Sequence, residues 1–425
     1  MRNPDPLHFL STAQKQYIAE ILEALTETLD LTDTQYQQIQ QAYRGVGKWL
    51  AESDDPLLHE TIIYSQGSVR LNTTVKPGPD EPFDIDLVCY LPHSGNELGE
   101  DVLDAVERRL REHERYKTMF ERLPRGFRIN YAASYHLDIT PGIDYYSYLR
   151  LKGHPLWVTD RNTQWKESNP DGYARWFDEI TEKKPLRVRE IFEAAAADSA
   201  LNKSVAPLPD HTRKKLLNRI VQILKRHRDE WIAAQSENKY PFKPISAIIT
   251  TLAAQSYQKI IEERRVYDND LDIIIDVIEL MPDFIARDAT GYCVLNPTMP
   301  AENFAEKWNV AEANKGQKLR DTFYEWHEAA WQSFDVIAAS VGRDKLLENI
   351  SKNFGSAPVK IVRDQMVNNL GELRRSGRLG LASGTGALVS GSVSAAPQNP
   401  VPSNTFYGSD SSATAAVPRN TFFGE

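Results

Sequence analysis

Cysteine is scarce in this sequence, since only Cys89 and Cys293 occur among 425 residues. A disulfide framework or a cysteine-rich zinc site needs more thiols, so both are excluded. No run of about 18 apolar residues occurs, and the first ten residues, MRNPDPLHFL, contain no hydrophobic segment of a secretion signal. These absences predict a cytoplasmic protein that does not associate with a membrane.

A basic excess is also missing. The chain has 59 acidic and 50 basic residues, which gives a net charge of -9 at pH 7. General duplex-binding proteins usually carry a strong basic excess, because they neutralise phosphates. The composition therefore argues against such a protein but is compatible with small charged substrates. The length is sufficient for two lobes and a sizeable core.

The most informative segment begins at Gly67 and reads GSVRLNTTVKPGPDEPFDIDLVCY. Its Gly-Ser turn follows a short apolar segment. Gly67 permits the close backbone approach that phosphate oxygens need, and Ser68 adds a hydroxyl and an amide N–H at the expected start of a helix. The turn therefore predicts a phosphate-binding site.

Two aspartates follow this turn in the alternating stretch FDIDLVCYL, residues 83–91. Alternation predicts a strand, in which Asp84 and Asp86 point to the same face. Like charges on one face repel each other unless a cation lies between them. A hard cation such as Mg²⁺ suits carboxylate oxygens. The pair is therefore a candidate metal site, although an isolated DxD is more often a solvated edge strand.

A third carboxylate comes from the stretch SYHLDITPG, residues 134–142, which predicts a second strand. There His136, Asp138 and Thr140 share one face. We predict Asp138 as the third metal ligand. Two alternatives stay open at this point: Asp144 could take the metal role, and Asp138 could cap the turn that follows. Three carboxylates with two Mg²⁺ ions suit phosphoryl transfer.

The ordered set of GS, then DID, then a strand with LD resembles the DNA polymerase β-type nucleotidyltransferases. More narrowly, it resembles the bacterial CD-NTases, relatives of cyclic GMP-AMP synthase. Four further segments fit this family: NPDGYARWFDE (169–179), KLLNRIVQILKRHRD (215–229), KPISAIITTLAA (243–254) and LNPTMPAENFAEKWN (295–309). The resemblance as a whole covers about residues 40–345. The resemblance implies an α+β fold with a polymerase β-like core, in which helices pack on a mixed twisted sheet, and a helical second lobe.

The resemblance also implies an activity. It is the joining of nucleoside triphosphates, ATP and/or GTP, into a cyclic di- or trinucleotide second messenger, with release of pyrophosphate, in anti-phage defence of the CBASS type. The reaction would use two Mg²⁺ ions, with Mn²⁺ as a substitute. Asp84, Asp86 and Asp138 would be the catalytic, metal-binding residues, and Gly67 with Ser68 would contact phosphate. The zinc-bearing insertion of the animal DNA sensor has no counterpart here, which argues against activation by duplex DNA.

A basic region around residues 203–228 supplies further candidates. Its simplest explanation is ordinary solubility, because charged side chains usually face water. A Lys or Arg across a cleft from the carboxylates would instead neutralise a triphosphate. By resemblance to the family, Lys225 and Ser246 are the candidates for phosphate contacts, with Arg219 as a substitute for Lys225.

We predict three parts in the chain. Residues 1–200 form the catalytic lobe, with two N-terminal helices within residues 12–50 bracing the sheet, and residues 201–375 form a helical lobe that completes the nucleotide cleft. Residues 376–425 are rich in Gly, Ser, Ala and Pro and predict a disordered tail. The tail contains the near-repeat VPSNTFYG (401–408) and VPRNTFFG (417–424), and the resemblance implies a ubiquitin-transfer-like conjugating partner there. The terminal Glu425 departs from the bare Gly or Ala end of such tails.

Two other functions compete with cyclic nucleotide synthesis. One is a linear nucleotidyltransferase that modifies an RNA or protein acceptor, which a long basic groove would favour and the acidic composition does not. The other is a catalytically silent relative that acts as a binding or scaffold protein. The intact set of carboxylates argues against the silent relative, because like charges held together without a use destabilise a fold.

Overall fold

The computed structural model describes residues 10–76, 82–95, 97–131, 135–146, 150–188, 214–376, 379–382, 388–390 and 398–400. The chain forms two compact units, Met1–Val359 and Lys360–Glu425. The predicted lobe boundary at residue 200 lies outside the described residues, so the domain limits stay a prediction. Among the described residues, no helix is both long and apolar enough to cross a bilayer.

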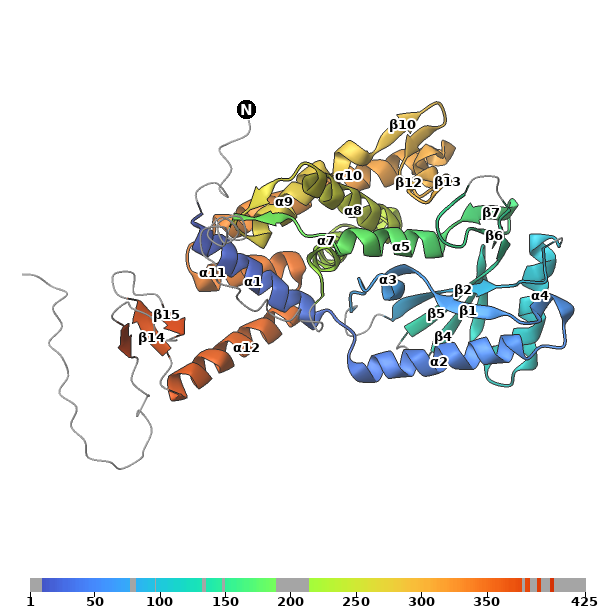
Figure 1. Ribbon diagram of the computed structural model, residues 1–425, viewed down its shortest axis with the longest axis horizontal. Helices are drawn as coiled ribbons and strands as arrows, with labels where there is room; N and C mark the ends of the chain where they lie inside the picture. The colour runs from blue at the N-terminus through green and yellow to red at the C-terminus, as the bar shows by residue number, and fades with distance from the viewer. Residues whose placement is uncertain are drawn as a thin grey trace, which may run out of the picture. The chain divides into compact units, whose positions relative to one another are not determined.

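A seven-stranded mixed sheet is the centre of the catalytic part of the first unit (Figure 1). Its central order is β1-β2-β5-β4-β3, and β6 joins β5 to β7. Strands β2 and β5 are parallel, and the other pairs are antiparallel. This arrangement confirms the predicted α+β fold. The strands are β1 (Ile62–Ser65), β2 (Phe83–Tyr90), β3 (Phe120–Leu123), β4 (Gly126–Tyr131), β5 (Tyr135–Asp144), β6 (Leu156–Asp160) and β7 (Gln164–Ser168).

The two faces of the sheet have different chemistry because side chains alternate along a strand. One face of β2, with Ile85, Leu87 and Cys89, is buried in the main core. Helices α2 (Asp33–Ala51) and α4 (Gly99–Glu112) contribute apolar residues to the same core. The aspartates of β2 alternate with these buried residues and therefore lie on the opposite face.

The two N-terminal helices pack against different partners. Helix α2 packs on the sheet, as predicted, whereas α1 (Thr12–Thr28) contacts α7 (Leu216–Ala233) and α9 (Asp270–Leu280). Lys15 of α1 pairs with Asp272 at 2.8 Å. The expectation that both helices brace the sheet was therefore wrong for α1, because its apolar stripe is buried against helices.

The second part of the first unit is mainly helical, as predicted, and packs around large buried side chains that include Trp326, Tyr257 and Phe323. Short strands make three small two-stranded sheets in this unit. The remaining elements are α3 (Gly67–Arg70), α5 (Pro170–Thr181), β8 (Leu186–Arg187), α8 (Ser246–Glu262), β9 (Val266–Tyr267), β10 (Ala286–Asp288), β11 (Gly291–Cys293), β12 (Leu295–Asn296), β13 (Met299–Asn303), α10 (Lys315–Ala338) and α11 (Arg343–Phe354).

Two Asn-Pro segments that are far apart in the sequence meet at the start of α5. Asn169 is fully buried and caps this helix, because its Oδ1 accepts from Gly172 N–H at 3.0 Å. Its Nδ2 donates to Lys152 O at 2.7 Å and to Thr298 O at 3.2 Å. Thr298 belongs to the second segment, which begins at the buried Asn296. This junction joins the sheet to the helical part.

The second unit contains most of α12 (Ser356–Arg375) and a small antiparallel sheet. Its strands are β14 (Leu379–Ala382), β15 (Leu388–Ser390) and β16 (Gln398–Pro400). These short strands lie within the stretch that the sequence predicts as a disordered tail. Both copies of the near-repeat and Glu425 lie outside the described residues, so the conjugating partner stays a prediction from the sequence.

The junction at α5 gives a stability prediction. Replacing Asn169 with Ala removes a helix cap and the donor to the carbonyls of Lys152 and Thr298, so we expect a loss of about 2–4 kcal/mol in the free energy of unfolding. Asn269→Ala is the matched control, since Asn269 caps α9 and its amide bonds Asp272 of the same helix. It should cost about 1 kcal/mol. Equal losses in urea titrations of the two variants would contradict the bridging role.

Candidate active site

Three carboxylates converge on one face of the two parallel strands at the centre of the sheet. Asp86 of β2 lies directly opposite Asp138 of β5, and Asp84 lies opposite His136. The Asp84 side chain is 55 % exposed, whereas that of Asp138 is 19 % exposed. The structure therefore brings together all three aspartates that the sequence singles out, and places Asp84 nearest to solvent.

The crowding of negative charge changes the acidity of the β2 aspartates. Burial and the neighbouring Asp138 and Asp84 raise the pKa of Asp86 to about 6, although Lys225 and Arg128 oppose the shift. Partial burial also raises the pKa of Asp84, with Arg128 opposing it. Each shift means that the ionised form of the carboxylate is disfavoured in the protein alone, so a cation bound nearby would be stabilising.

Gly67 lies against the buried end of this cluster. Its backbone has φ 62°, and a Cβ added there would stand 2.2 Å from Asp86 Oδ2. The Gln66 N–H also donates to Asp86 O at 2.8 Å. The helix α3 that follows has only four residues, and Ser68 within it is partly exposed. The predicted turn therefore lies directly beside the carboxylates.

Arg128 of β4 occupies the space between two of the carboxylates. Its Nε and Nη2 donate to the two oxygens of Asp138, both at 2.8 Å, and Nη2 also pairs with Asp84 Oδ1 at 3.0 Å. The hydrogen bonds to Asp138 are the main reason that the pKa of Arg128 is raised above its usual value. A planar guanidinium suits this two-pronged contact.

Three aspartate carboxylates are the donors that Mg²⁺ prefers, so the residues present fit a divalent metal by type. The side chains are not arranged as a metal site in this structure. In the described part of the chain, no group of three or more His, Cys, Asp or Glu is placed so that it could hold a metal ion. Arg128 bonds to both Asp138 and Asp84, so a metal ion would compete with it for their oxygens. Metal binding would require Arg128 to release at least one of them.

The alternative ligand Asp144 is engaged elsewhere. It lies at the end of β5, where Oδ1 contacts His154 Nε2 at 2.7 Å and Oδ2 accepts from Tyr90 OH at 3.0 Å. Six residues separate it from Asp138, which is about 20 Å along an extended strand. The structure therefore favours Asp138 over Asp144.

Lys225 approaches the cluster from α7 but is buried. Its side chain is 4 % exposed, and Nζ donates to Thr73 Oγ1 at 3.0 Å and to Thr73 O at 3.2 Å. Burial, with repulsion from Arg228, lowers the pKa of Lys225 to about 7, and attraction to Asp86 opposes the shift. In this structure Lys225 is therefore bound to protein atoms, and its predicted contact with phosphate stays a prediction.

The other two candidates for phosphate contacts, Ser246 and Arg219, have different partners. Ser246 is the first residue of α8, and its Oγ accepts from Arg228 Nη1 at 2.8 Å. Arg219 instead pairs with Glu23 of α1. The structure does not bring Arg219 to the carboxylates.

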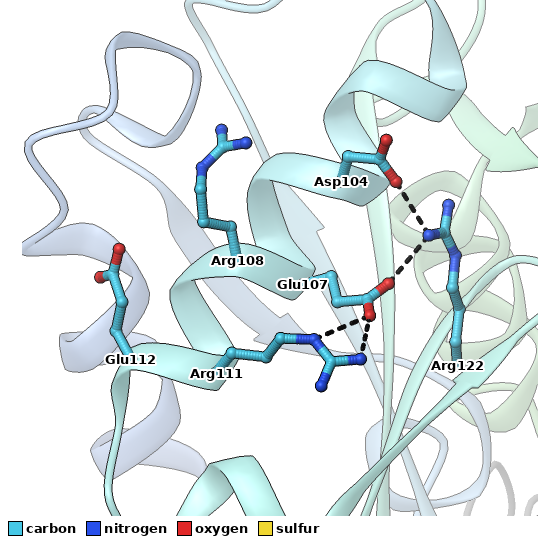
Figure 2. Close-up of a pocket in the computed structure, with 6 residues that line it drawn as sticks. All are labelled: Asp104, Glu107, Arg108, Arg111, Glu112 and Arg122. Carbon is cyan, nitrogen blue, oxygen red and sulfur yellow. Dashed lines mark hydrogen bonds and ion pairs between the residues drawn. The ribbon is translucent and has the colours of Figure 1, made fainter.

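A separate pocket of about 540 Å³ lies on α4 and β3 (Figure 2). Figure 2 shows Arg122 between Asp104 and Glu107, with Arg111 also paired to Glu107. Helix α4 packs on the sheet face opposite to the aspartates. Because Arg122 pairs with Glu100, Asp104 and Glu107 there, we interpret this pocket as a surface ion-pair network and not as the active site.

Comparison with known proteins agrees with this geometry. Residues 17–180 match the family described as the Second Messenger Oligonucleotide or Dinucleotide Synthetase domain. A c-di-GMP synthase from Roseivirga ehrenbergii is 30 % identical over 407 residues, which cover 94 % of this chain and 99 % of that protein. The chain belongs to the bacterial CD-NTase family. The sequence-based prediction of the family is thereby confirmed.

Solved structures show the same fold as this CD-NTase. CdnG from Bradyrhizobium diazoefficiens, in complex with GTP, has a TM-score of 0.59 at 18 % identity and covers 83 % of this chain and 99 % of its own. CdnC from E. coli, with ATP, has a TM-score of 0.51 at 13 % identity and covers 82 % and 98 %. These structures show the fold, and membership of the family, shown by the relative from Roseivirga ehrenbergii, makes the protein a nucleotidyltransferase of the class that makes cyclic oligonucleotides.

Several residues of this CD-NTase site escaped prediction from the sequence. Arg128 bridges two carboxylates, and Lys243 lies near enough to Asp84 to influence its pKa. Lys243 and Arg228 both pair with Asp229 at 2.7 Å. Lys243 was hard to predict, because the sequence pointed to its segment, residues 243–254, only through the resemblance to the family.

Gly67 should be intolerant of any side chain. Gly67→Ala introduces a Cβ that collides with Asp86 and forces a left-handed backbone on Ala, so we expect pyrophosphate release to fall at least about 100-fold. Gly342→Ala is the matched control, since Gly342 has φ 85° but nothing within 4 Å of an added Cβ. It should lose about 1 kcal/mol of stability and keep full activity. Equal activity in the two variants would contradict the close packing of Gly67 on Asp86.

The raised pKa of Asp86 gives a pH-dependent prediction for the metal-free protein. Its folded pKa of about 6 lies above the ordinary value of 3.8, so ionisation of Asp86 lowers the stability of the native protein as pH rises from about 4 to 6. Asp86→Asn removes this loss. Relative to the native protein, the variant should gain about 2–3 kcal/mol in free energy of unfolding between pH 4 and pH 7. A pH-independent difference in urea titrations with chelator would contradict the buried charge.

Proposed function

We propose that this CD-NTase makes a cyclic dinucleotide from GTP, with Mg²⁺ at Asp84, Asp86 and Asp138, and that the product acts in bacterial anti-phage defence. The register of Asp86 with Asp138, beside the Gly67 turn, is the observation that carries the site assignment. The choice of GTP is supported by the c-di-GMP synthase that is 30 % identical over almost the whole chain. A cytoplasmic location follows as part of the same proposal.

The residues around the turn would bind the triphosphate. The backbone of Gly67 can approach phosphate oxygens closely, and the partly exposed Ser68 would donate from its hydroxyl and amide. Across the site, Lys243 and Arg228 carry positive charge on either side of Asp229. Their ammonium and guanidinium groups would balance the phosphate charge that the carboxylates repel.

Chemistry would begin when a ribose hydroxyl of one nucleotide attacks the α-phosphorus of the other. A P–O bond to the ribose oxygen forms, the bond to the pyrophosphate leaving group breaks, and the hydroxyl proton passes to the Asp138 carboxylate. A second transfer of the same kind closes the ring. Bound Mg²⁺ ions would supply Lewis acidity at the attacking oxygen and charge neutralisation at the departing pyrophosphate. Mn²⁺ would serve in place of Mg²⁺, since it takes the same oxygen ligands.

Arg128 would change its role during this cycle. In the structure it neutralises Asp138 and Asp84. After release, its guanidinium would remain close enough to orient Asp138 as the proton acceptor. We therefore assign Asp138 two roles, metal ligand and base, while Asp84 and Asp86 complete the metal site that holds the triphosphate.

The test is mass spectrometry of reactions that contain purified protein, Mg²⁺ and each ribonucleoside triphosphate alone or in pairs. After nuclease and phosphatase treatment, GTP alone should give a resistant cyclic dinucleotide. Asp84→Asn/Asp86→Asn should reduce the product at least about 1,000-fold, because two charge-bearing ligands are lost. Asp104→Asn, on the opposite face of the sheet, should leave it unchanged.

Other results of this test would overturn the proposal in defined ways. A product that needs ATP would contradict the assignment of GTP. A phosphatase-sensitive linear oligonucleotide would favour the linear transferase. Unchanged product in the double aspartate variant would show that the chemistry takes place elsewhere.

A further inference from the structure

Three polar side chains of α7 lie on one stripe of the helix and point to the same segment of the catalytic lobe. They are Asn218, Gln222 and Lys225, spaced i, i+4 and i+7, which places them on one helix face. The segment that they contact, Leu71–Thr74, directly follows α3, which begins with the Gly67–Ser68 turn. We name these three residues the α7 ladder.

Each member of the α7 ladder donates to the segment Leu71–Thr74. The bonds are Asn218 Nδ2 to Leu71 O at 2.8 Å, Gln222 Nε2 to Thr74 O at 2.7 Å, and Lys225 Nζ to Thr73 Oγ1 and O at 3.0 and 3.2 Å. One helix face is thus bonded to Leu71, Thr73 and Thr74, and two further bonds join Lys76 and Gln222 to the chain just after α1. The Lys76 N–H donates to Leu29 O, and Gln222 Nε2 also donates to Asp30 Oδ1, both at 2.8 Å.

The side chains that make these bonds are buried. Asn218, Gln222 and Lys225 are 6 %, 0 % and 4 % exposed, and Thr73 is fully buried. A polar group in such a place destabilises the fold unless it is paired, and an ammonium group does so most. The pairing with this segment therefore offsets the destabilisation that a buried lysine on α7 would otherwise cause.

The segment Leu71–Thr74 is itself bonded to the phosphate-binding turn. The Thr73 N–H donates to Ser68 O at 2.9 Å. A continuous path therefore runs from Lys225 through Thr73 to Ser68. The other restraints on the turn are the bond from Gln66 N–H to Asp86 O and the close contact of Gly67 with Asp86, and α3 adds only four residues.

We propose that the α7 ladder is a positioning device that sets the distance between the Gly67–Ser68 turn and the helical lobe, and that Lys225 acts through Thr73. This assigns Lys225 a positioning role beside the direct phosphate contact that the family resemblance implies. The inference rests on the proposed function only in that the turn binds the triphosphate. The bonds themselves are present without nucleotide.

A double-mutant cycle tests the path from Lys225 to Thr73. The variants are Thr73→Val, Lys225→Met and both together, with His227→Leu as control. His227 is buried on the same helix, but its ring bonds Ser333 and Trp326 within the helical lobe. Two readouts are taken: hydrogen exchange of the Thr73 and Gln66 amides without metal or nucleotide, and kcat and KM for GTP.

We expect each single variant to speed exchange at the two amides about tenfold and to lower kcat/KM about tenfold, since each leaves a buried partner unpaired or loosens the turn. The double variant should lie within about threefold of the worse single variant, because both changes break one path. His227→Leu should lower Tm and leave both readouts unchanged.

Three outcomes would overturn the inference. If Thr73→Val changes neither readout while Lys225→Met raises KM for GTP alone, Lys225 contacts phosphate directly. If the effects of Thr73→Val and Lys225→Met multiply in the double variant, the two residues act independently. If His227→Leu speeds hydrogen exchange at the Thr73 amide as much as Lys225→Met does, the changes in exchange reflect only the general stability of the fold. If native protein forms no product, the proposed function fails, and the exchange data alone decide on the ladder.

Discussion

Negative charge held on one face of two neighbouring strands is the constraint on which the site depends. Asp84, Asp86 and Asp138 are brought together by the parallel register of β2 and β5, and burial together with their mutual repulsion raises the pKa of Asp86. A fold that keeps such a cluster must supply positive charge, because unpaired carboxylates in a partly buried site destabilise it. The opposite face of the same strands shows none of this conflict, since it packs as an ordinary apolar core under α2 and α4.

The compensating charge comes from two directions. Arg128 reaches the cluster from within the sheet and binds Asp138 through two oxygens. Lys225, from the helical lobe, is buried and lowers the pKa of Asp86 by its charge, while its own pKa is lowered by burial. Each lobe thus contributes to the stability of one carboxylate cluster. On the proposed mechanism, Arg128 is the group that divalent metal replaces, whereas Lys225 stays in place and holds the turn beside it.

Much of the site followed from spacing that is local in the sequence. Alternation in FDIDLVCYL was enough to put Asp84 and Asp86 on one face, and the same rule placed Asp138. Arg128 could also have been found, because only three residues separate β4 from β5, and a hairpin that tight puts Arg128 opposite Asp138. The contacts of α7 could not have been predicted from the sequence, because Lys225 and Thr73 are 152 positions apart. The placement of α1 failed for a related reason: an apolar stripe indicates that a helix is buried but does not say against what.

The central claim is that Asp84, Asp86 and Asp138 form a divalent metal site once Arg128 releases them. Titration of the protein with Mn²⁺ in the presence of a non-hydrolysable GTP analogue, followed by electron paramagnetic resonance, tests it without any turnover. We expect two bound ions per chain in the native protein and loss of at least one in Asp138→Asn, with Asp104→Asn binding as the native protein does. Equal Mn²⁺ binding by the native protein and Asp138→Asn would contradict the claim.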